Sequence, residues 1–338
     1  MAKWTDEERA TAAARLRSQL LSGPPASAVK DVVGRLLAVQ AQDPRGFRLA
    51  VRCRSTGLTA ADVDQALSDQ RSVVVTWLNR GTLHLVRAED YWWLHPLTTP
   101  QLVTTSERRL RQEGVSPQQA ERGIAIVVEA VATDGPQTRH QLRSRLDAEG
   151  IPNRGQALVH LLLAASLRGH LVRGPVVDGE HAFASVAAWL GAAPPPLDRD
   201  AALGRLAERY LAGHAPAEPR DLAKWAGITL GDARRAFEHG ADVQAPQGEV
   251  PPPRLLGAFD PLLHGWASRE LFVGHHAGVV TSNGVFRPVA LVDGRVVATW
   301  SMPGGRVELT PLEPVAAEAR AALDADAADV ERYLGLQT

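Results

Sequence analysis

Apolar residues recur mainly at helical spacing up to residue 245, and short strand-like runs dominate beyond it. In the N-terminal block, Thr5 and Glu8 form a capping-box pattern that opens the first of several amphipathic helices. These helices are expected over residues 5–20, 29–39 and 59–67. Two β-branched, apolar runs at 73–77 and 82–86 lie on either side of a polar turn and predict a hairpin. Helices followed by a two-stranded wing indicate a winged helix.

Two further blocks repeat this plan. The second has helices expected over residues 101–112, 117–133, 138–148 and 154–168, with a wing over 169–183. Within it, the stretch 138–169 has the spacing of a helix-turn-helix. The third block follows the linker Ala193-Pro194-Pro195-Pro196 and has helices expected over residues 198–212, 218–226 and 229–239. Its last two helices join at Gly227-Ile228, again with helix-turn-helix spacing.

The composition changes at the proline-rich stretch 246–253, and strand-like runs alternate with glycine turns beyond it. The runs are 254–257, 271–273, 278–281, 285–291, 295–300 and 306–310. Asn283-Gly284 and Asp293-Gly294 are strong hairpin signals. The pattern predicts a small antiparallel barrel or sheet, with an alanine-rich, acidic helix over 315–334 packed on it. The expected fold is mainly α with β: tandem winged-helix (helix-turn-helix) domains plus a C-terminal small antiparallel β-barrel, with domains at 1–97, 98–192, 193–245 and 246–338.

Length and composition limit the class of protein. A chain of 338 residues, 45% of them hydrophobic, buries more than one core, and two to four compact units are expected. Cys53 is the single cysteine, which rules out an intramolecular disulfide and a cysteine-cluster zinc site and favours a reducing cytoplasm. The first residues are polar and acidic, and no apolar run approaches the roughly 18 residues of a membrane span. A soluble cytoplasmic protein with no membrane partner is expected.

The net charge gives no global basic footprint, because 37 Lys and Arg residues face 38 Asp and Glu residues. Locally, Arg45, Arg48 and Arg52 lie at i, i+3 and i+7 and predict one basic stripe if residues 47–54 form a helix. An ordinary solvated helix face is an equal alternative. The lysines of the chain are Lys3, Lys30 and Lys224.

Most familiar catalytic motifs are absent: the chain has no glycine-rich phosphate loop after a strand, no His-Glu-x-x-His and no Gly-x-Ser-x-Gly. His275 and His276 are adjacent, so on a strand they would point to opposite faces, and no metal site is expected from them. Asp43 and Asp260 are the most notable of several acids that could serve a hydrolase, and their spacing does not identify a carboxylate pair. Each has a structural alternative, Asp43 as the cap of the following helix and Asp260 as a turn residue that bonds the backbone.

Gln40-Ala41-Gln42 is the most informative motif of the chain. It ends the apolar stretch 36–39, for which a helix is expected, and Asp43-Pro44 closes that helix because proline disfavours helical geometry in the preceding residue. Two glutamines at i and i+2 cannot share a helix face. They are therefore expected where the helix runs out and both amides turn towards a common cleft. The structural alternative is a polar patch at the helix end.

This motif and four other segments resemble the AlkZ-like winged-helix family of bacterial DNA glycosylases, which includes AlkZ and AlkX (YcaQ). The other segments are residues 77–84, 88–94, 259–263 and 292–300. The resemblance implies three tandem winged helices and a C-terminal β-barrel, and cleavage of bulky N7-alkylguanine adducts from duplex DNA. The family's catalytic motif is Gln-Φ-Gln in the AlkZ-like branch and Gln-Φ-Asp in the AlkX-like branch. Matched to this sequence, it makes Gln40 and Gln42 the catalytic residues, with Ala41 as a small Φ.

The implied chemistry is hydrolysis of an N-glycosidic bond by a monofunctional glycosylase with no metal or organic cofactor. A purine alkylated at N7 already carries a positive charge, so it leaves without a general acid. Amide groups at about 3 Å then suffice to place a water and to stabilise an oxocarbenium-like sugar. A lyase would need an amine nucleophile, and the lysines lie far from the glutamines in sequence. The expected role is repair of alkylation damage, including antibiotic self-resistance, in the nucleoid of a bacterial cytoplasm.

The expected partner is double-stranded DNA containing alkylated guanine, bound by a monomer in an open cleft. The candidate DNA-binding residues are Arg45, Arg48, Arg80, Arg173, His275, His276 and Arg287. The histidines and Arg287 flank a hairpin at Ser282-Asn283-Gly284 that is expected to probe the duplex. Arg80 and His84 have a structural alternative, which is to fix the wing against Trp77.

Two other functions stay open at this point. A winged-helix transcriptional regulator without catalysis is the main alternative, although regulators are usually symmetric dimers with one recognition helix per half-site. A protein–protein scaffold is the third reading, and the near-zero net charge favours it.

Overall fold

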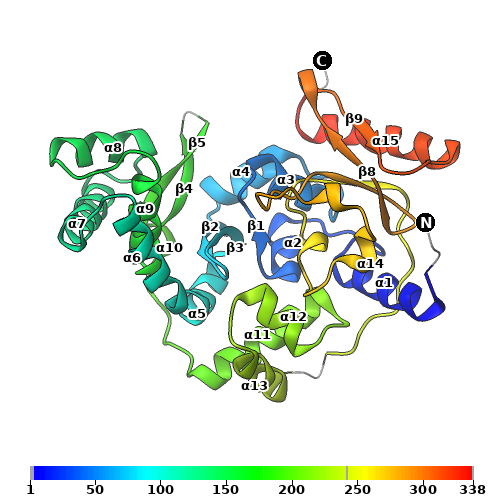
Figure 1. The fold of residues 1–338 in the computed structure, drawn as a ribbon, viewed down its shortest axis with the longest axis horizontal. Helices are drawn as coiled ribbons and strands as arrows, with labels where there is room; N and C mark the ends of the chain where they lie inside the picture. The colour runs from blue at the N-terminus through cyan, green and yellow to red at the C-terminus, as the bar shows by residue number, and fades with distance from the viewer. Residues whose placement is uncertain (1–3, 178, 241–242, 337–338) are drawn as a thin grey trace. The chain divides into compact units, whose positions relative to one another are not determined.

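The computed structural model describes residues 4–177, 179–240 and 243–336 (Figure 1). Internal contacts divide the chain into two compact units, one formed by Met1–Val63 with Leu203–Thr338 and the other by Asp64–Ala202. The first unit therefore joins the two ends of the chain. The four domains expected from the sequence divide the chain more finely and stay a prediction. No helix among the described residues is long and apolar enough to cross a membrane.

The first unit begins with short helices and one short strand. α1 (Asp6–Ser18) opens with the predicted Thr5–Glu8 capping box. α2 (Val29–Leu36) was expected to reach residue 39 but ends at Leu36, because Leu37 adopts φ 64° and leaves the helical conformation. The next elements are β1 (Val39–Gln40), α3 (Pro44–Arg52) and α4 (Ala60–Ser68), the last of which continues into the second unit.

The helices of the third block are formed as predicted. They are α11 (Arg199–His214), α12 (Pro219–Ala226) and α13 (Leu230–Gly240). Gly227 has φ 71°, a left-handed conformation that ends α12 and lets the chain turn into α13. No hairpin follows α13 within residues 243–253, so this block consists of helices without a wing.

The C-terminal strands form an antiparallel sheet in the order β6-β7-β8-β9. They are β6 (Arg254–Leu256), β7 (Val289–Val292), β8 (Arg295–Ser301) and β9 (Glu308–Pro311). The predicted turn at Asp293-Gly294 is confirmed: both residues have positive φ and connect the paired residues Val292 and Arg295.

The predicted β-barrel is wrong, because the sheet of the described residues is open, with β6 and β9 at its edges. Two segments that were expected to be strands, 271–273 and 278–281, lie largely in α14 (Glu270–Val273) and the 3-10 turn η3 (Ala277–Val279). Too few strands remain to close a barrel. Two further 3-10 turns are η2 (Pro261–Leu263) and η4 (Pro303–Gly305).

The C-terminal helix α15 (Ala317–Tyr333) packs on the sheet as predicted. Its buried residues Leu323, Val330 and Tyr333 share one apolar cluster with Leu49 of α3 and Trp300 of β8. The helix that follows the glutamine motif and the C-terminal sheet therefore belong to the same core.

The second unit holds both predicted hairpins in one antiparallel sheet, with strand order β3-β2-β4-β5. The strands are β2 (Val73–Leu78), β3 (Thr82–Arg87), β4 (Leu171–Val177) and β5 (Glu180–Ser185). The helical segments are α5 (Ala88–Thr98), η1 (Pro100–Leu102), α6 (Val103–Gln112), α7 (Pro117–Thr133), α8 (Arg139–Ala148), α9 (Ala157–Leu167) and α10 (Val186–Leu190). α9, the second helix of the predicted helix-turn-helix, packs against α6, α7 and the sheet and has no exposed residue.

Candidate functional site

Gln40 and Gln42 face each other at the end of β1. The chain is extended at β1, and alternate residues of an extended segment point to the same side. Gln40 Nε2 donates a hydrogen bond of 3.1 Å to Gln42 Oε1. Gln40 is 5% exposed, whereas Gln42 is open to solvent. The two amides meet through this bond, and an extended segment rather than a helix end produces the arrangement. That both amides line a common cleft stays a prediction.

A strained turn precedes the motif. Leu37 has φ 64° and ψ −49°, and the Ala38 N–H donates to the Leu36 carbonyl at 2.8 Å. This is a γ-turn with positive φ, which bulky residues rarely adopt. Leu37 is fully buried, so the surrounding core holds a conformation that the chain alone would avoid.

Helix α11 packs tightly against the end of α2, just before that turn. A Cβ atom at Gly213 would lie 2.3 Å from the Arg35 carbonyl oxygen, so only glycine allows this approach. Arg209 also donates to the Gly34 carbonyl at 2.7 Å. The backbone that leads into the glutamines is therefore held from the side of α11.

Asp43 caps the helix that follows the motif. Its Oδ1 accepts a hydrogen bond from the Gly46 N–H, and Pro44 occupies the first turn of α3. The structural alternative for Asp43 is confirmed.

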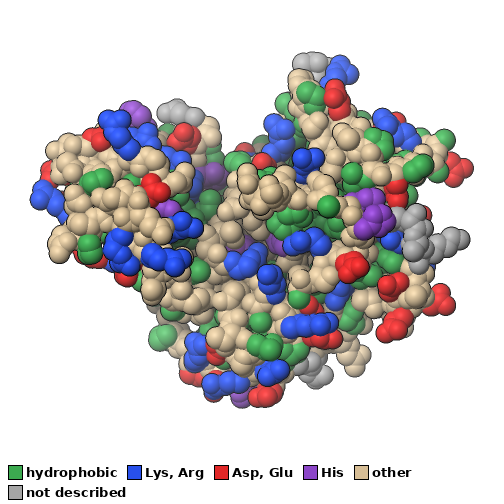
Figure 2. Space-filling view, viewed as in Figure 1, with side chains coloured by type: hydrophobic (Ala, Val, Ile, Leu, Met, Phe, Trp, Pro, Cys, Tyr) green, Lys and Arg blue, Asp and Glu red, His purple; other side chains and the backbone are tan. Residues whose placement is uncertain are grey.

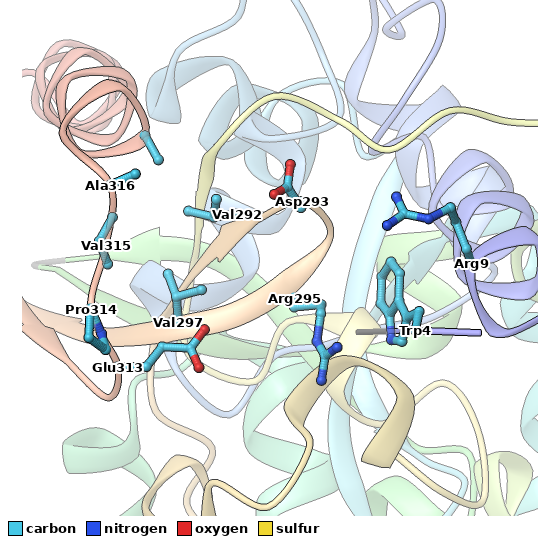
Figure 3. A pocket seen from close by; sticks show the side chains of 11 residues that line it. Trp4, Arg9, Val292, Asp293, Arg295, Val297, Glu313, Pro314, Val315 and Ala316 are labelled. Atoms are coloured by element: carbon cyan, nitrogen blue, oxygen red, sulfur yellow. The ribbon is translucent and has the colours of Figure 1, made fainter. Parts of the chain in front are cut away.

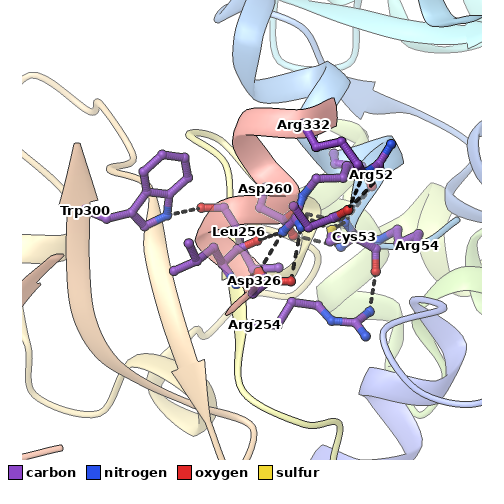
Figure 4. Close-up of polar contacts among 12 residues, drawn as sticks. Arg52, Cys53, Arg54, Arg254, Leu256, Asp260, Trp300, Asp326 and Arg332 are labelled. Atoms are coloured by element: carbon purple, nitrogen blue, oxygen red, sulfur yellow. Dashed lines mark hydrogen bonds and ion pairs between the residues drawn. The ribbon is translucent and has the colours of Figure 1, made fainter. Parts of the chain in front are cut away.

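The predicted basic stripe is wrong for Arg52. Its guanidinium is buried between the Asp326 carboxylate and the Leu255 carbonyl, 2.8 Å from each (Figure 4). Arg45 is exposed and forms no ion pair among the described residues, and Arg48 donates to a backbone carbonyl one turn back in α3. Only Arg45 and Arg48 remain of the stripe, because Arg52 fastens α3 to β6 and α15.

Asp260 is not available as a hydrolytic acid. It is fully buried and forms a two-pronged ion pair with Arg54, with N–O distances of 2.7 and 2.8 Å (Figure 4). It also accepts the Leu262 N–H at 3.0 Å, so its predicted role in a turn is confirmed. Burial is the largest single influence on the pKa of Arg54 and lowers it, but the charge and hydrogen bonds of Asp260, together with those of Cys53, raise it overall. Sequence reasoning missed Arg54, because 206 positions separate the partners and no local signal links them.

Two cavities in the first unit lie away from the glutamines. They have volumes of about 400 and 460 Å³, and both are lined by Trp4 and Arg295. Figure 3 shows the first, in which Arg9 and Arg295 flank the Trp4 ring at 5.9 and 5.4 Å from its centroid. Neither cavity is lined by Gln40 or Gln42.

The hairpin predicted at Ser282-Asn283-Gly284 is present as a short tip. Val280 and Phe286 form an isolated antiparallel bridge, and Gly284 takes φ 75° between them. Val285 is 45% exposed and Arg287 is exposed just beyond the bridge. The tip therefore presents one apolar side chain and one cation to solvent.

His275 and His276 lie in the loop between α14 and η3, not on a strand. His275 is exposed, and His276 Nε2 lies 3.9 Å from the Glu313 carboxylate. Within the described residues, no group of three or more His, Cys, Asp and Glu side chains is placed to hold a metal ion.

Arg80, His84 and Arg173 belong to the second unit. His84 is 2% exposed, and its Nδ1 lies 2.9 Å from the Thr82 carbonyl, in keeping with the structural alternative. Arg80 is half-buried in the β2–β3 turn, and burial lowers its pKa. The Arg173 guanidinium lies 4.6 Å from the Phe183 ring centroid, and burial lowers the pKa of Arg173 to about 10. Arg80 and Arg173 are therefore more enclosed than Arg45.

Comparison with known proteins gives one consistent result. The family model described as DNA glycosylase AlkZ-like matches residues 33–333. The chain is 28% identical over 378 residues to an interstrand DNA cross-link repair glycosylase from Streptomyces sahachiroi, with 95% of each chain covered. Among solved structures it is similar to Streptomyces sahachiroi DNA glycosylase AlkZ, with a TM-score of 0.79 and 25% identity over 99% of this chain and 98% of that one.

Proposed function

Because this chain belongs to the AlkZ-like family of DNA glycosylases, we propose that its substrates are bulky or cationic N7-alkylguanines in duplex DNA. The observation that carries the proposal is the amide pair, in which a nearly buried Gln40 holds the exposed Gln42 through a 3.1 Å hydrogen bond. The similar Streptomyces sahachiroi protein is named for interstrand cross-link repair, so cross-linked guanine is included as a substrate class. The enzyme acts as a monomer in the bacterial cytoplasm, in alkylation repair or self-resistance.

The amide pair supplies the polar groups that this reaction needs. The cationic base leaves with the bonding electrons, the sugar becomes oxocarbenium-like, and water adds to C1′ and loses its proton to the surrounding solvent. The hydrogen bond uses one N–H of Gln40 and the carbonyl oxygen of Gln42. It leaves the Gln40 carbonyl oxygen to accept a hydrogen bond from water and to face the positive sugar, and the Gln42 amide to donate. Neither group accepts a full proton, so the substrate must be a good leaving group.

The small number of lysines in this chain favours hydrolysis without a covalent enzyme–sugar intermediate. A lyase would attack the sugar with a lysine amine. Lys30 and Lys224 are exposed on α2 and α12, whereas Lys3 lies outside the described residues. We therefore assign a monofunctional glycosylase, which leaves an abasic site and an uncut strand.

DNA contacts are assigned to basic side chains of the first unit. Arg45 and Arg48 lie within two turns of the motif in α3 and suit the phosphates that flank the adduct. Arg287 and His275 are exposed on or near the segment that carries the hairpin tip, and we assign that tip to the duplex. His276 is assigned a smaller part, because its side chain is 10% exposed and faces Glu313. Arg80 and Arg173 are enclosed, so their contribution to DNA affinity is expected to be smaller.

The transcriptional-regulator alternative loses one of its two candidate recognition helices. A regulator reads bases with an exposed recognition helix; α9 of the helix-turn-helix predicted at 138–169 has no exposed residue, whereas α13 of the third block has exposed residues.

The test is excision of N7-methylguanine from a duplex, scored as abasic sites, by the wild type and a Gln40→Ala/Gln42→Ala variant. The variant should lose about 100-fold or more in rate, because the groups that face the developing charge are removed. Gln65→Ala/Gln70→Ala is the matched control, since these exposed glutamines also pair, with a 3.5 Å hydrogen bond. Equal abasic-site yields from the wild type and the motif variant would end the glycosylase assignment of this pair.

A further inference from the structure

The C-terminal end of α11 lies against the end of α2, two residues before the γ-turn that leads into the glutamine motif. An added Cβ atom at Gly213 would lie 2.3 Å from the Arg35 carbonyl oxygen and 3.3 Å from Leu36 Cα. Alanine is ordinarily more stable than glycine inside a helix. Glycine at this position therefore serves the contact between the two helices and not α11 itself.

The end of α11 is fixed from several directions. Four consecutive carbonyl groups, at residues 212–215, each accept a side-chain hydrogen bond from another segment. The donors are Arg35 of α2 at 3.3 Å, Gln19 and Ser18 at the end of α1 at 3.0 and 2.7 Å, and Trp266 at 2.9 Å. The last carbonyl groups of a helix have no partner within it, so these bonds satisfy groups that would otherwise be orphaned. The end of α11 cannot move away from α2 without breaking them.

The buried segment 36–41 connects this contact to the glutamines. None of its residues is more than 5% exposed. Within it, Leu37 turns the chain out of α2 at φ 64°, and Gln40 follows three residues later in the extended strand β1. A close-packed interior transmits a displacement instead of absorbing it. The place at which α11 holds α2 therefore sets the place of the Gln40 amide.

We propose that Gly213 is a positioning residue for the amide pair, because its missing side chain lets α11 hold α2 where Gln40 faces the sugar. The atoms nearest to the added Cβ are backbone atoms of α2, so Gly213 acts on the amides through the backbone. The inference rests on the proposed function, since it takes Gln40 and Gln42 to be the groups that face the sugar. It gives the third helical block a part in catalysis that is separate from any DNA contact.

Gly213→Ala tests the proposal on a duplex that contains N7-methylguanine. Real Cβ atoms essentially never approach closer than 3.0 Å, so the contact with the Arg35 carbonyl oxygen must open from 2.3 Å. A misplacement of about 1 Å at the reacting groups can cost about 100-fold in rate. The single-turnover rate constant should therefore fall by about 10- to 100-fold. The Kd for the same duplex should stay within about twofold, because no assigned DNA contact changes.

Gly240→Ala is the matched control. Its added Cβ atom would lie 2.0 Å from the Gly204 carbonyl oxygen, so it disturbs α11 at least as severely, but from α13 and away from α2. It should leave both the rate constant and the Kd within about twofold of the wild type. Urea unfolding of each variant verifies that the protein is folded at the assay temperature.

Arg209→Met gives a second and milder test that adds no bulk to the contact. It removes the 2.7 Å hydrogen bond from Arg209 to the Gly34 carbonyl in α2. The rate constant should fall by about threefold at an unchanged Kd. This variant decides the question if Gly213→Ala does not fold.

Three results would overturn the inference. The first is a wild-type rate constant in folded Gly213→Ala or, where that variant does not fold, in Arg209→Met. The second is an equal loss of rate in Gly240→Ala, which would show general damage to α11. The third is a Kd that rises as much as the rate constant falls. A Gln40→Ala/Gln42→Ala variant measured alongside keeps the two claims apart, because wild-type excision by that variant would refute the proposed function whatever Gly213→Ala does.

Discussion

The shared orientation of Gln40 and Gln42 depends on backbone geometry at single residues. The apolar run before the motif indicates a helix, and this pattern cannot reveal that Leu37 takes a positive φ. That conformation is unfavourable for a bulky residue, and it persists only because tertiary packing stabilises it. The sequence therefore singled out the two glutamines, whose role stays a prediction, whereas the reason for their arrangement, an extended segment after a γ-turn, needed the structure.

Gln42→Glu gives a residue-scale test, because it exchanges an amide for a carboxylate of the same length. The Gln40 N–H can still donate to the new carboxylate, which adds a negative charge beside the oxocarbenium-like sugar. The ionised form is the useful one, so activity should be full above a carboxyl pKa of about 4.3 and fall as the pH drops through it. The wild-type pair has no titrating group and should lack this acid limb. Excision rates on N7-methylguanine from pH 4 to 8, corrected for spontaneous depurination, measure the difference. If both proteins lose activity identically at low pH, the loss does not come from the carboxylate at position 42.

At the scale of elements, short sequence motifs correctly predicted turns and helix starts, which depend on neighbouring residues. Asp293-Gly294 gave the correct β7–β8 turn, and the Thr5–Glu8 capping box gave the correct start of α1. The barrel prediction failed because short apolar runs such as 271–273 fit a helix turn as well as a strand, and tertiary packing chose the helix. The Arg54–Asp260 ion pair could not be predicted for a different reason: no spacing rule relates residues from distant parts of the chain.

Arg54→Ala tests how firmly α3 is fastened to the C-terminal half of the first unit. Removal of Arg54 leaves the Asp260 carboxylate fully buried without its cation, which should destabilise the protein by about 3–5 kcal/mol. Arg320→Ala breaks an exposed i, i+4 pair with Asp324 and should cost about 0–1 kcal/mol. Urea unfolding monitored by tryptophan fluorescence measures both. An Arg54→Met/Asp260→Leu variant removes both charges and should recover much of the loss, so equal losses for the single and double variants would contradict the ion-pair account.

At the scale of the whole molecule, the order of helices and hairpins was predictable, but their grouping was not. Residues 1–63 share a compact unit with 203–338, and the hairpin that was expected to complete the first block belongs to the other unit. Sequence patterns report which face of an element is apolar, and they carry no information on which distant element covers that face. The helix that follows the glutamine motif therefore depends on C-terminal residues for its support, as the contacts of Arg52 at its end and of Arg54 just beyond it show.

The near-zero net charge makes a specific prediction about DNA binding. On the face drawn in Figure 2, basic and acidic side chains are interspersed, in keeping with a net charge of −1. Non-specific affinity should then come from a few placed cations, so the logarithm of the binding constant should fall only gently with the logarithm of the salt concentration. Each phosphate contact contributes about 0.9 to that slope.

Arg45→Ala and Arg287→Ala should each lower the magnitude of this slope by about 0.9 on unmodified duplex, measured by fluorescence anisotropy between 50 and 200 mM salt. Arg332→Ala, whose side chain is paired with Asp329 on α15, is the control and should leave the slope unchanged. If all three variants shift the slope equally, the contacts are diffuse, and the assignment of DNA contacts to the exposed cations near the glutamine motif and the hairpin tip does not hold.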